Sequence, residues 1–88
     1  MLPLSAGMIV TVLFHSYFKE LTGTASVPEA LPTGSTLGEL HDRLMARFPK
    51  LVAMKNSTLL AVGLEYQPRS QMLREGDEVS LFPPVQGG

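Results

Sequence analysis

One amphipathic helix among several short apolar runs is the feature that most restricts how this sequence can fold. Residues 36–48 open with Thr36 and Glu39, the spacing of a capping box, and Pro49 ends the helical pattern. The apolar stripe of this helix consists of Leu37, Leu40, Leu44 and Phe48. Because a single helix cannot bury the remaining apolar runs, the pattern predicts an α+β fold, with one mixed sheet packed against one main helix.

The sheet is predicted from segments rich in β-branched and aromatic residues. The first of them is largely apolar on both faces, which indicates a central position and is often seen with parallel pairing, and the nearly apolar first and last strands are expected at the centre of the sheet. Pro28 lacks an N–H group and confines the second segment to a sheet edge. The predicted strands are residues 8–15, 24–31, 58–62, 65–67 and 78–82.

Small polar residues and glycines indicate where these elements are joined. Ser16 is expected to cap a short helix over residues 17–21, and Gly23 to end it in the left-handed conformation. Gly63 indicates a turn between the third and fourth strands. Gly76 indicates a tight turn just before the last strand.

Length and composition exclude several classes of protein. A chain of 88 residues forms one domain, and its net charge of -1 without a basic stripe argues against nucleic acid as the main ligand. The absence of cysteine removes disulfides, thiolate metal sites and thiol nucleophiles. His15 and His41, the only histidines, have no partner at metal-ligand spacing, so no metal site is expected.

The sequence also argues against a membrane protein. The longest apolar run, residues 8–14, is far shorter than the ~20 residues that span a bilayer. No basic region precedes it and no clear cleavage site follows it, as a signal peptide would require. A soluble cytoplasmic protein is therefore expected.

The last six residues are the segment most suggestive of chemistry. Pro83 and Pro84 end the last strand and favour an extended exit, and Gly87 and Gly88 are slim enough to enter a narrow channel. The expected organisation is an N-terminal extension at residues 1–7, a folded domain at 8–82 and a C-terminal tail at 83–88.

Three sequence patterns resemble the small subunits of molybdopterin synthase. The most specific is GDEV at residues 76–79 followed by FPPV at 82–85 and the final diglycine. The segments AVGLEY at 61–66 and VLFHSYFKELTG at 12–23 are also similar to this family. The chain departs from the family pattern at Gly63, where asparagine is usual, and in the additional residues 1–7.

This resemblance implies a ubiquitin-like β-grasp fold and the role of a sulfur carrier. An activating enzyme that uses ATP and Mg would adenylate Gly88, and a sulfur donor protein would convert it to a thiocarboxylate. The large synthase subunit would then accept the tail, in a heterotetramer of the family type, and the sulfur would pass to cyclic pyranopterin monophosphate. The implied reacting end is Gly87 and Gly88, and the implied partner contacts are Phe82, Pro83, Pro84, Val85 and Gln86.

Residue chemistry agrees with this role. An ionised α-carboxylate is a poor electrophile, and adenylation gives it a leaving group. Without cysteine, sulfur carried covalently has to sit on Gly88, and the chain is expected to act as a co-substrate that binds no cofactor of its own. Phe82 and Val85 are expected to be exposed anchors for the partner. Leu64 is a further candidate, and Leu81 is expected in the core.

Three alternatives remain open at this point. A thiamine-type sulfur carrier also ends in diglycine, although such proteins lack the FPPV run. A ubiquitin-like modifier would be joined through Gly88 to lysines of other proteins. A plain interaction module would use the same surface without any chemistry at the tail.

Overall fold

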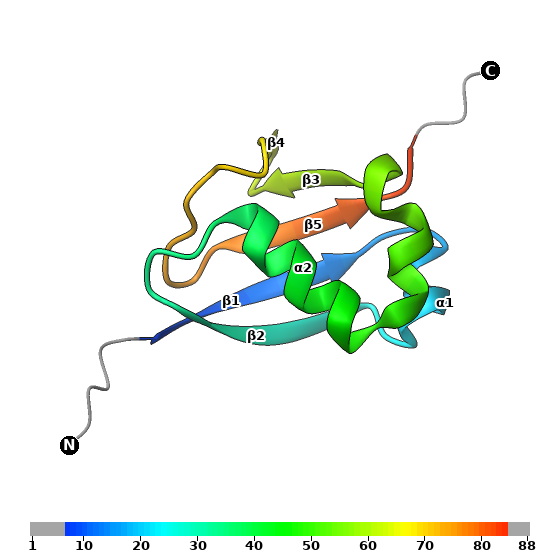
Figure 1. Ribbon diagram of the computed structural model, residues 1–88, viewed down its shortest axis with the longest axis horizontal. Helices are drawn as coiled ribbons and strands as arrows, with labels where there is room; N and C mark the ends of the chain where they lie inside the picture. The colour runs from blue at the N-terminus through cyan, green and yellow to red at the C-terminus, as the bar shows by residue number, and fades with distance from the viewer. Residues whose placement is uncertain (1–6, 85–88) are drawn as a thin grey trace.

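A mixed sheet with strand order β2-β1-β5-β3-β4 is the framework of the protein, and α2 lies across one of its faces (Figure 1). The computed structural model describes residues 7–84. Only β1 and β5 pair in parallel; the other neighbouring strands are antiparallel. The elements are β1 (Gly7–Phe14), α1 (Phe18–Thr22), β2 (Ser26–Pro32), α2 (Leu37–Arg47), the 3₁₀ segment η2 (Pro49–Ser57), β3 (Leu59–Val62), β4 (Glu65–Tyr66) and β5 (Glu78–Phe82).

The predicted fold class and element order are confirmed. β5 is the central strand, β1 lies beside it in parallel, and β2 with Pro28 forms an edge. β1 begins at Gly7, one residue before the predicted start of the folded domain. The rest of the predicted N-terminal extension lies outside the described residues.

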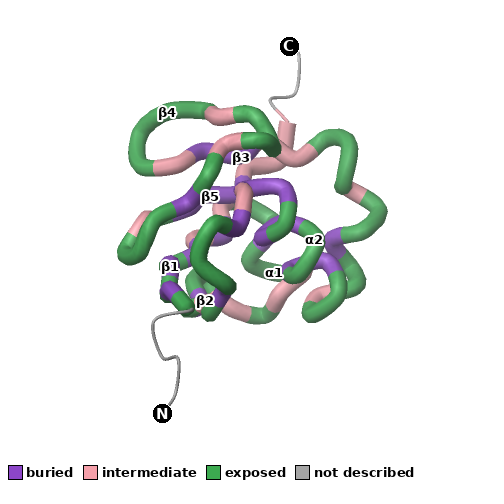
Figure 2. Tube along the Cα trace, turned by 60° about the vertical axis from the view of Figure 1, so that its left-hand side comes forward, coloured by how far each residue is buried: buried purple, intermediate pink, exposed green. Residues whose placement is uncertain are grey.

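The core lies between the sheet and α2. Alternate residues of β1 are buried, as the two-residue repeat of a strand requires. They meet the apolar stripe of α2, in which Leu37, Leu40 and Leu44 are fully buried. Figure 2 shows buried stretches along β1, β5 and α2, whereas the residues of β4 are exposed. Burial is therefore concentrated on the side of the sheet that faces α2.

Backbone conformation confirms the predicted glycine turns and corrects one cap. Gly23, Gly63 and Gly76 have φ of 80°, 62° and 84°, in the left-handed region that glycine adopts without strain. Ser16 does not cap α1: its own φ is 57°, and Tyr17 precedes the helix without a side-chain cap bond.

The segment after α2 is helical, which the sequence pattern did not predict. Pro49 ends α2 as expected, but its fixed φ also suits the first turn of a new helix, and η2 begins there. Leu51 is buried against the core, and the Thr58 hydroxyl donates to the Met54 carbonyl at 2.7 Å. The segment covers the end of the sheet from which β5 leaves the fold (Figure 1).

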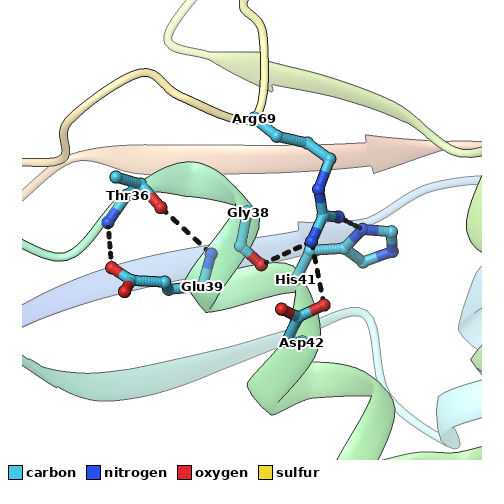
Figure 3. A network of polar contacts seen from close by, with 6 residues as sticks. All are labelled: Thr36, Gly38, Glu39, His41, Asp42 and Arg69. Atoms are coloured by element: carbon cyan, nitrogen blue, oxygen red, sulfur yellow. Dashed lines mark hydrogen bonds and ion pairs between the residues drawn. The ribbon is translucent and has the colours of Figure 1, made fainter.

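A network of polar contacts fastens the loop before β5 to the start of α2 (Figure 3). The predicted capping box is present: Thr36 N–H donates to Glu39 Oε1 at 2.8 Å, and Glu39 N–H donates to Thr36 Oγ1 at 3.2 Å. The Arg69 carbonyl accepts from Gly38 N–H at 2.8 Å. A Cβ at Gly38 would lie 3.0 Å from the Cβ of Arg69, so glycine permits this close approach.

Candidate partner-docking surface and tail exit

The structure determines where the tail leaves the domain. Phe82 is the last residue of β5 and pairs with Leu59 of β3, and on the other side His15 N–H donates to the Leu81 carbonyl at 3.1 Å. Pro83 and Pro84 follow, both half-buried. The remaining predicted site residues, Val85, Gln86, Gly87 and Gly88, lie outside the described residues.

Phe82 belongs to an aromatic cluster at this exit. Its ring stacks on the His15 ring with centroids 4.3 Å apart and an interplanar angle of 14°. The Tyr66 ring meets it edge-on at 6.1 Å and 79°. The rings come from β4, β5 and the residue after β1, so the base of the tail is held by three parts of the fold.

The cluster closes one end of an open groove of about 360 Å³. The groove lies on the sheet face opposite the core, because its β5 residues alternate with the buried Val79 and Leu81. Its floor includes Ala61 and Ser80, which are buried even though no helix covers them. The lining residues are Leu13, His15, Ala61, Gly63, Leu64, Tyr66, Glu78, Ser80 and Phe82.

The residues predicted to contact a partner differ in how far their side chains are exposed to solvent. Phe82 is half-buried rather than freely exposed, because His15 and Tyr66 cover part of its ring. Leu64 is fully exposed at the tip of the hairpin between β3 and β4, and Leu81 is buried in the core as expected. An exposed leucine beside an aromatic cluster is typical of a surface that a protein partner covers.

Sequence reasoning missed His15 and Tyr66 as members of this surface. The pairing of Tyr66 with Ala61 places its side chain on the groove face, where it is 65% exposed. His15 follows the outward positions 9, 11 and 13 of the first strand. Once the strand pairing is known, the alternation of side chains along each strand places both residues on the groove face.

Two polar features of the groove have no partner among the described residues. Nε2 of His15 is buried without a hydrogen bond. Glu78 is the only lining residue with a formal charge, and no ion pair reaches its exposed side chain within residues 7–84. The Glu78 carboxylate is therefore open to solvent at one end of the groove, whereas Nε2 of His15 is covered by the fold.

His41 is a structural residue on the opposite side of the sheet. Its ring is buried, and Nδ1 lies 2.7 Å from Nη1 of Arg69, whose Nη2 donates to Gly38 O and Asp42 Oδ1 (Figure 3). Burial and, to a smaller degree, the Arg69 charge lower the pKa of His41 to about 4. The hydrogen bond from Arg69 likewise lowers the pKa of Asp42. His41 is thus neutral and accepts a hydrogen bond from Arg69.

Residues 7–84 contain no group of three histidine or acidic side chains that could hold a metal ion. None of the helices in the same range is long and apolar enough to cross a bilayer.

Curated relatives cover nearly the whole chain. The molybdopterin synthase sulfur carrier subunit of Arabidopsis thaliana is 33% identical over 79 residues, spanning 90% of this chain and 82% of the relative. The subunit of the same name from Homo sapiens is 31% identical over 82 residues, spanning 90% of this chain and 93% of the relative. Identity of this level over this length indicates common descent.

Solved structures share the fold. SAMP1 of Haloferax volcanii matches with a TM-score of 0.82 at 23% identity, over 91% of this chain and 99% of that one. A putative molybdopterin converting factor subunit 1 from Pyrococcus furiosus matches with a TM-score of 0.82 at 26% identity, over 89% of this chain and 99% of that one. Subunits 1 and 2 of the molybdopterin-converting factor of Helicobacter pylori were solved as a complex. A chain of this complex matches with a TM-score of 0.65 at 23% identity, over 92% of this chain and 100% of that one.

These neighbours confirm the ubiquitin-like β-grasp fold that the resemblance implied. The model of the ThiS family matches residues 12–88, a range that includes the groove, the tail and the final diglycine. The chain belongs to the ThiS family, within the ubiquitin-like sulfur carriers.

Proposed function

We propose that this chain is the sulfur carrier subunit of molybdopterin synthase. The observation that carries the proposal is the similarity to subunits of that name over 90% of the chain, within a family match that extends to Gly88. In this role Gly88 donates sulfur to cyclic pyranopterin monophosphate during molybdenum cofactor biosynthesis. The proposed compartment is the cytoplasm.

The proposed reaction changes only the terminal carboxylate. An activating enzyme that uses ATP and Mg joins AMP to one carboxylate oxygen and releases pyrophosphate, which makes the carbonyl carbon electrophilic. Sulfur at the oxidation level of sulfide, delivered by a donor protein, attacks this carbon, AMP leaves, and Gly88 ends in a thiocarboxylate. The thiocarboxylate sulfur then bonds to the pterin, and water attacks the carbonyl carbon, which breaks the C–S bond, leaves the sulfur on the pterin and restores the carboxylate. The chain supplies the reacting terminus, and the enzymes around it supply the catalytic groups.

The groove and the tail exit suit docking to the large synthase subunit. Phe82 is packed between His15 and Tyr66, so the direction in which Pro83 and Pro84 leave is restricted before a partner binds. Such preorganisation lowers the entropy lost on binding. The complex of the Helicobacter pylori subunits supports a two-subunit assembly. We extend it to a heterotetramer, with Val85 and Gln86 as further contacts and Gly87 beside the reacting end.

Intact-mass spectrometry after incubation with ATP, the activating enzyme and a sulfur donor tests this proposal. The expected result is a mass gain equal to the replacement of one oxygen by sulfur, localised by fragmentation to Gly88. Adding the large subunit and the pterin substrate should reverse the gain and form molybdopterin. A matched control is the chain without Gly87 and Gly88, which should remain unmodified.

Two results would contradict the proposal. An unmodified terminus, with enzymes that activate another carrier in parallel, would exclude sulfur carriage. High-mass conjugates to lysines of other proteins, lost on removal of Gly88, would instead identify a ubiquitin-like modifier.

A further inference from the structure

The outer side of β2 is the longer of the two edges of the sheet. Within residues 7–84, β2 pairs only with β1, and no strand lies beyond it (Figure 1). An uncovered edge offers a row of N–H and C=O groups to which another chain can add a strand. How much of this edge is open depends on the partner that each of these groups already has.

The pairing with β1 determines which residues of β2 face outward. Phe14 N–H donates to the Ala25 carbonyl at 2.8 Å, so the polar groups of Ala25 point toward β1. Because these directions alternate along an antiparallel pair, the polar groups of residues 27, 29 and 31 also point toward β1. The residues whose polar groups point away from the sheet are therefore Ser26, Pro28, Ala30 and Pro32.

Prolines occupy two of these four outward positions. Pro28 and Pro32 have no N–H, so neither can donate a hydrogen bond to an added strand. The Pro32 carbonyl accepts from the Ser35 N–H at 3.1 Å and from the Ser35 hydroxyl at 2.8 Å. The turn that leads into α2 therefore closes this end of the edge.

The Thr24 hydroxyl closes the other end. It donates to the Ser26 carbonyl at 3.0 Å, and the Ser26 N–H donates to the same hydroxyl at 3.4 Å. Both outward groups of Ser26 thus have a partner within the chain. Ala30 is the only outward residue whose N–H has no acceptor in the described part of the chain. Each copy of the protein therefore has one free donor at this edge.

The side chain of Glu29 also opposes pairing between two copies. It points to the α2 side of the sheet, where it forms an ion pair with Arg47. One donor from each copy allows at most two hydrogen bonds between two antiparallel β2 edges. The register that pairs Ala30 with Pro28 of the other copy also sets the two Glu29 side chains directly opposite each other, where like charges are destabilising.

We propose that β2 is a closed edge: its prolines, the Thr24 hydroxyl and the Glu29 carboxylate prevent a second copy of this chain from adding a strand to the sheet. The chain then stays monomeric at high concentration, although its edge strand is seven residues long. This property is independent of the proposed function. It leaves the other surfaces of the fold to binding partners.

Restoring the missing donors tests the proposal. Pro28→Val gives each copy a second outward donor, and adding Pro32→Val gives it a third. Each added donor allows two further hydrogen bonds across a symmetric dimer, so the dimerisation constant should rise about tenfold per substitution. Sedimentation equilibrium of the full chain at millimolar concentration measures this. The parent chain should remain monomeric, whereas the double variant should form dimers.

Thr11→Val is the matched control. Thr11 lies directly opposite Pro28 on β1 and is also exposed, so this substitution places a valine beside the same position of the sheet. It adds no outward donor, because the N–H of residue 11 donates to the Asp77 carbonyl at 2.9 Å. This variant should remain monomeric. Thermal unfolding of each variant first establishes that the fold is retained.

Amide hydrogen exchange locates the contact and can also be measured on the parent chain. In the parent, the Ala30 N–H should exchange rapidly at every protein concentration, whereas the Glu29 N–H, which points toward β1, should be protected. In the double variant, the Ala30 N–H should become protected as the protein concentration rises.

Any one of three results would overturn the inference. The double variant could stay as monomeric as Thr11→Val, its dimers could leave the Ala30 N–H unprotected, or the parent could protect this N–H increasingly with concentration. The first would show that the prolines do not close the edge, the second would place the contact elsewhere, and the third would show that the edge is open. None of them affects the mass-spectrometric test at Gly88.

Discussion

The two faces of the sheet are built from the same strands but have different environments. On the helix side, Val12 of β1 and Val79 of β5 meet the leucines of α2 and are fully buried. On the other side, Leu13 and Glu78 face an open groove that ends at the tail exit. One face provides most of the stability of the fold, and the other is left for a partner.

The comparison shows how closely these two roles lie along the chain. Leu81 is in the core, whereas Phe82, the next residue, lines the groove and leads into the tail. Because successive side chains of a strand point to opposite faces, a change at one position affects stability and a change at its neighbour affects binding. Variants of each face can therefore separate the two properties.

The largest effect is expected on the helix side. Leu40→Ala removes a side chain with 0% exposure from the centre of α2 and leaves a cavity that the close-packed core can only partly close. The free energy of unfolding should fall by about 3 kcal/mol. Urea denaturation followed by circular dichroism measures it. A loss under about 1 kcal/mol would contradict the assignment of this face as the source of stability.

Acidification should weaken the same side through His41. The folded protein keeps His41 neutral down to a pKa of about 4, whereas the unfolded chain takes up this proton near the ordinary value of 6.5. The contribution of neutral His41 to the free energy of unfolding is therefore fully present above pH 6.5. It is lost as the pH falls toward 4, which lowers the free energy of unfolding by roughly 3 kcal/mol at most. Urea denaturation at about pH 7.5, 6, 5 and 4 measures how the free energy of unfolding changes over this range.

The control for this pH dependence is His41→Gln, which cannot titrate. Its stability should change less over the same pH range than that of the parent chain, even if its stability near neutral pH is lower. Equal slopes in the two proteins would mean that His41 does not carry the acid sensitivity.

On the groove side, Phe82→Ala should reduce binding while the fold survives. It removes the ring that stacks on His15 and meets Tyr66, and so frees the base of the tail. Affinity for the large subunit should drop about tenfold or more, as for other aromatic anchors. Titration gives the affinity, and circular dichroism reports the fold. Unchanged affinity would remove Phe82 from the docking surface.

The smallest effect on stability is expected at the hairpin tip. Leu64→Ala changes a fully exposed side chain, so the free energy of unfolding should remain within about 0.5 kcal/mol of the parent value. Binding to the large subunit should weaken about threefold, because the leucine lies on the groove. If the free energy of unfolding fell while the affinity for the large subunit stayed the same, Leu64 would belong to the part of the fold that provides stability and not to the binding face.

Local signals predicted most of the fold. The capping box at Thr36 and Glu39 and the glycines of the turns act within a few residues, so their geometry follows from the sequence around them. Central, parallel placement of the first and last strands followed from their apolar residues. The helical η2 and the positive φ of Ser16 did not, because both depend on how the chain packs against the finished sheet.

The candidate site was only partly predictable. The tail and Phe82 were identified from residue types at the end of the chain, whereas His15 and Tyr66 join Phe82 only through pairing between strands far apart in sequence. The unpaired Nε2 of His15 likewise has no signature in the sequence. The sequence therefore led to the prediction of the tail as the reacting segment, but not to the aromatic surface at its exit.

The parallel pairing of β1 and β5 has a mechanical consequence. The start of β1 and the end of β5 lie at opposite ends of the two strands (Figure 1). A pull on the tail against the start of the chain would slide the strands past each other, loading all their ladder hydrogen bonds at once rather than one after another. The domain should therefore resist being unfolded by a force that pulls these two strand ends apart.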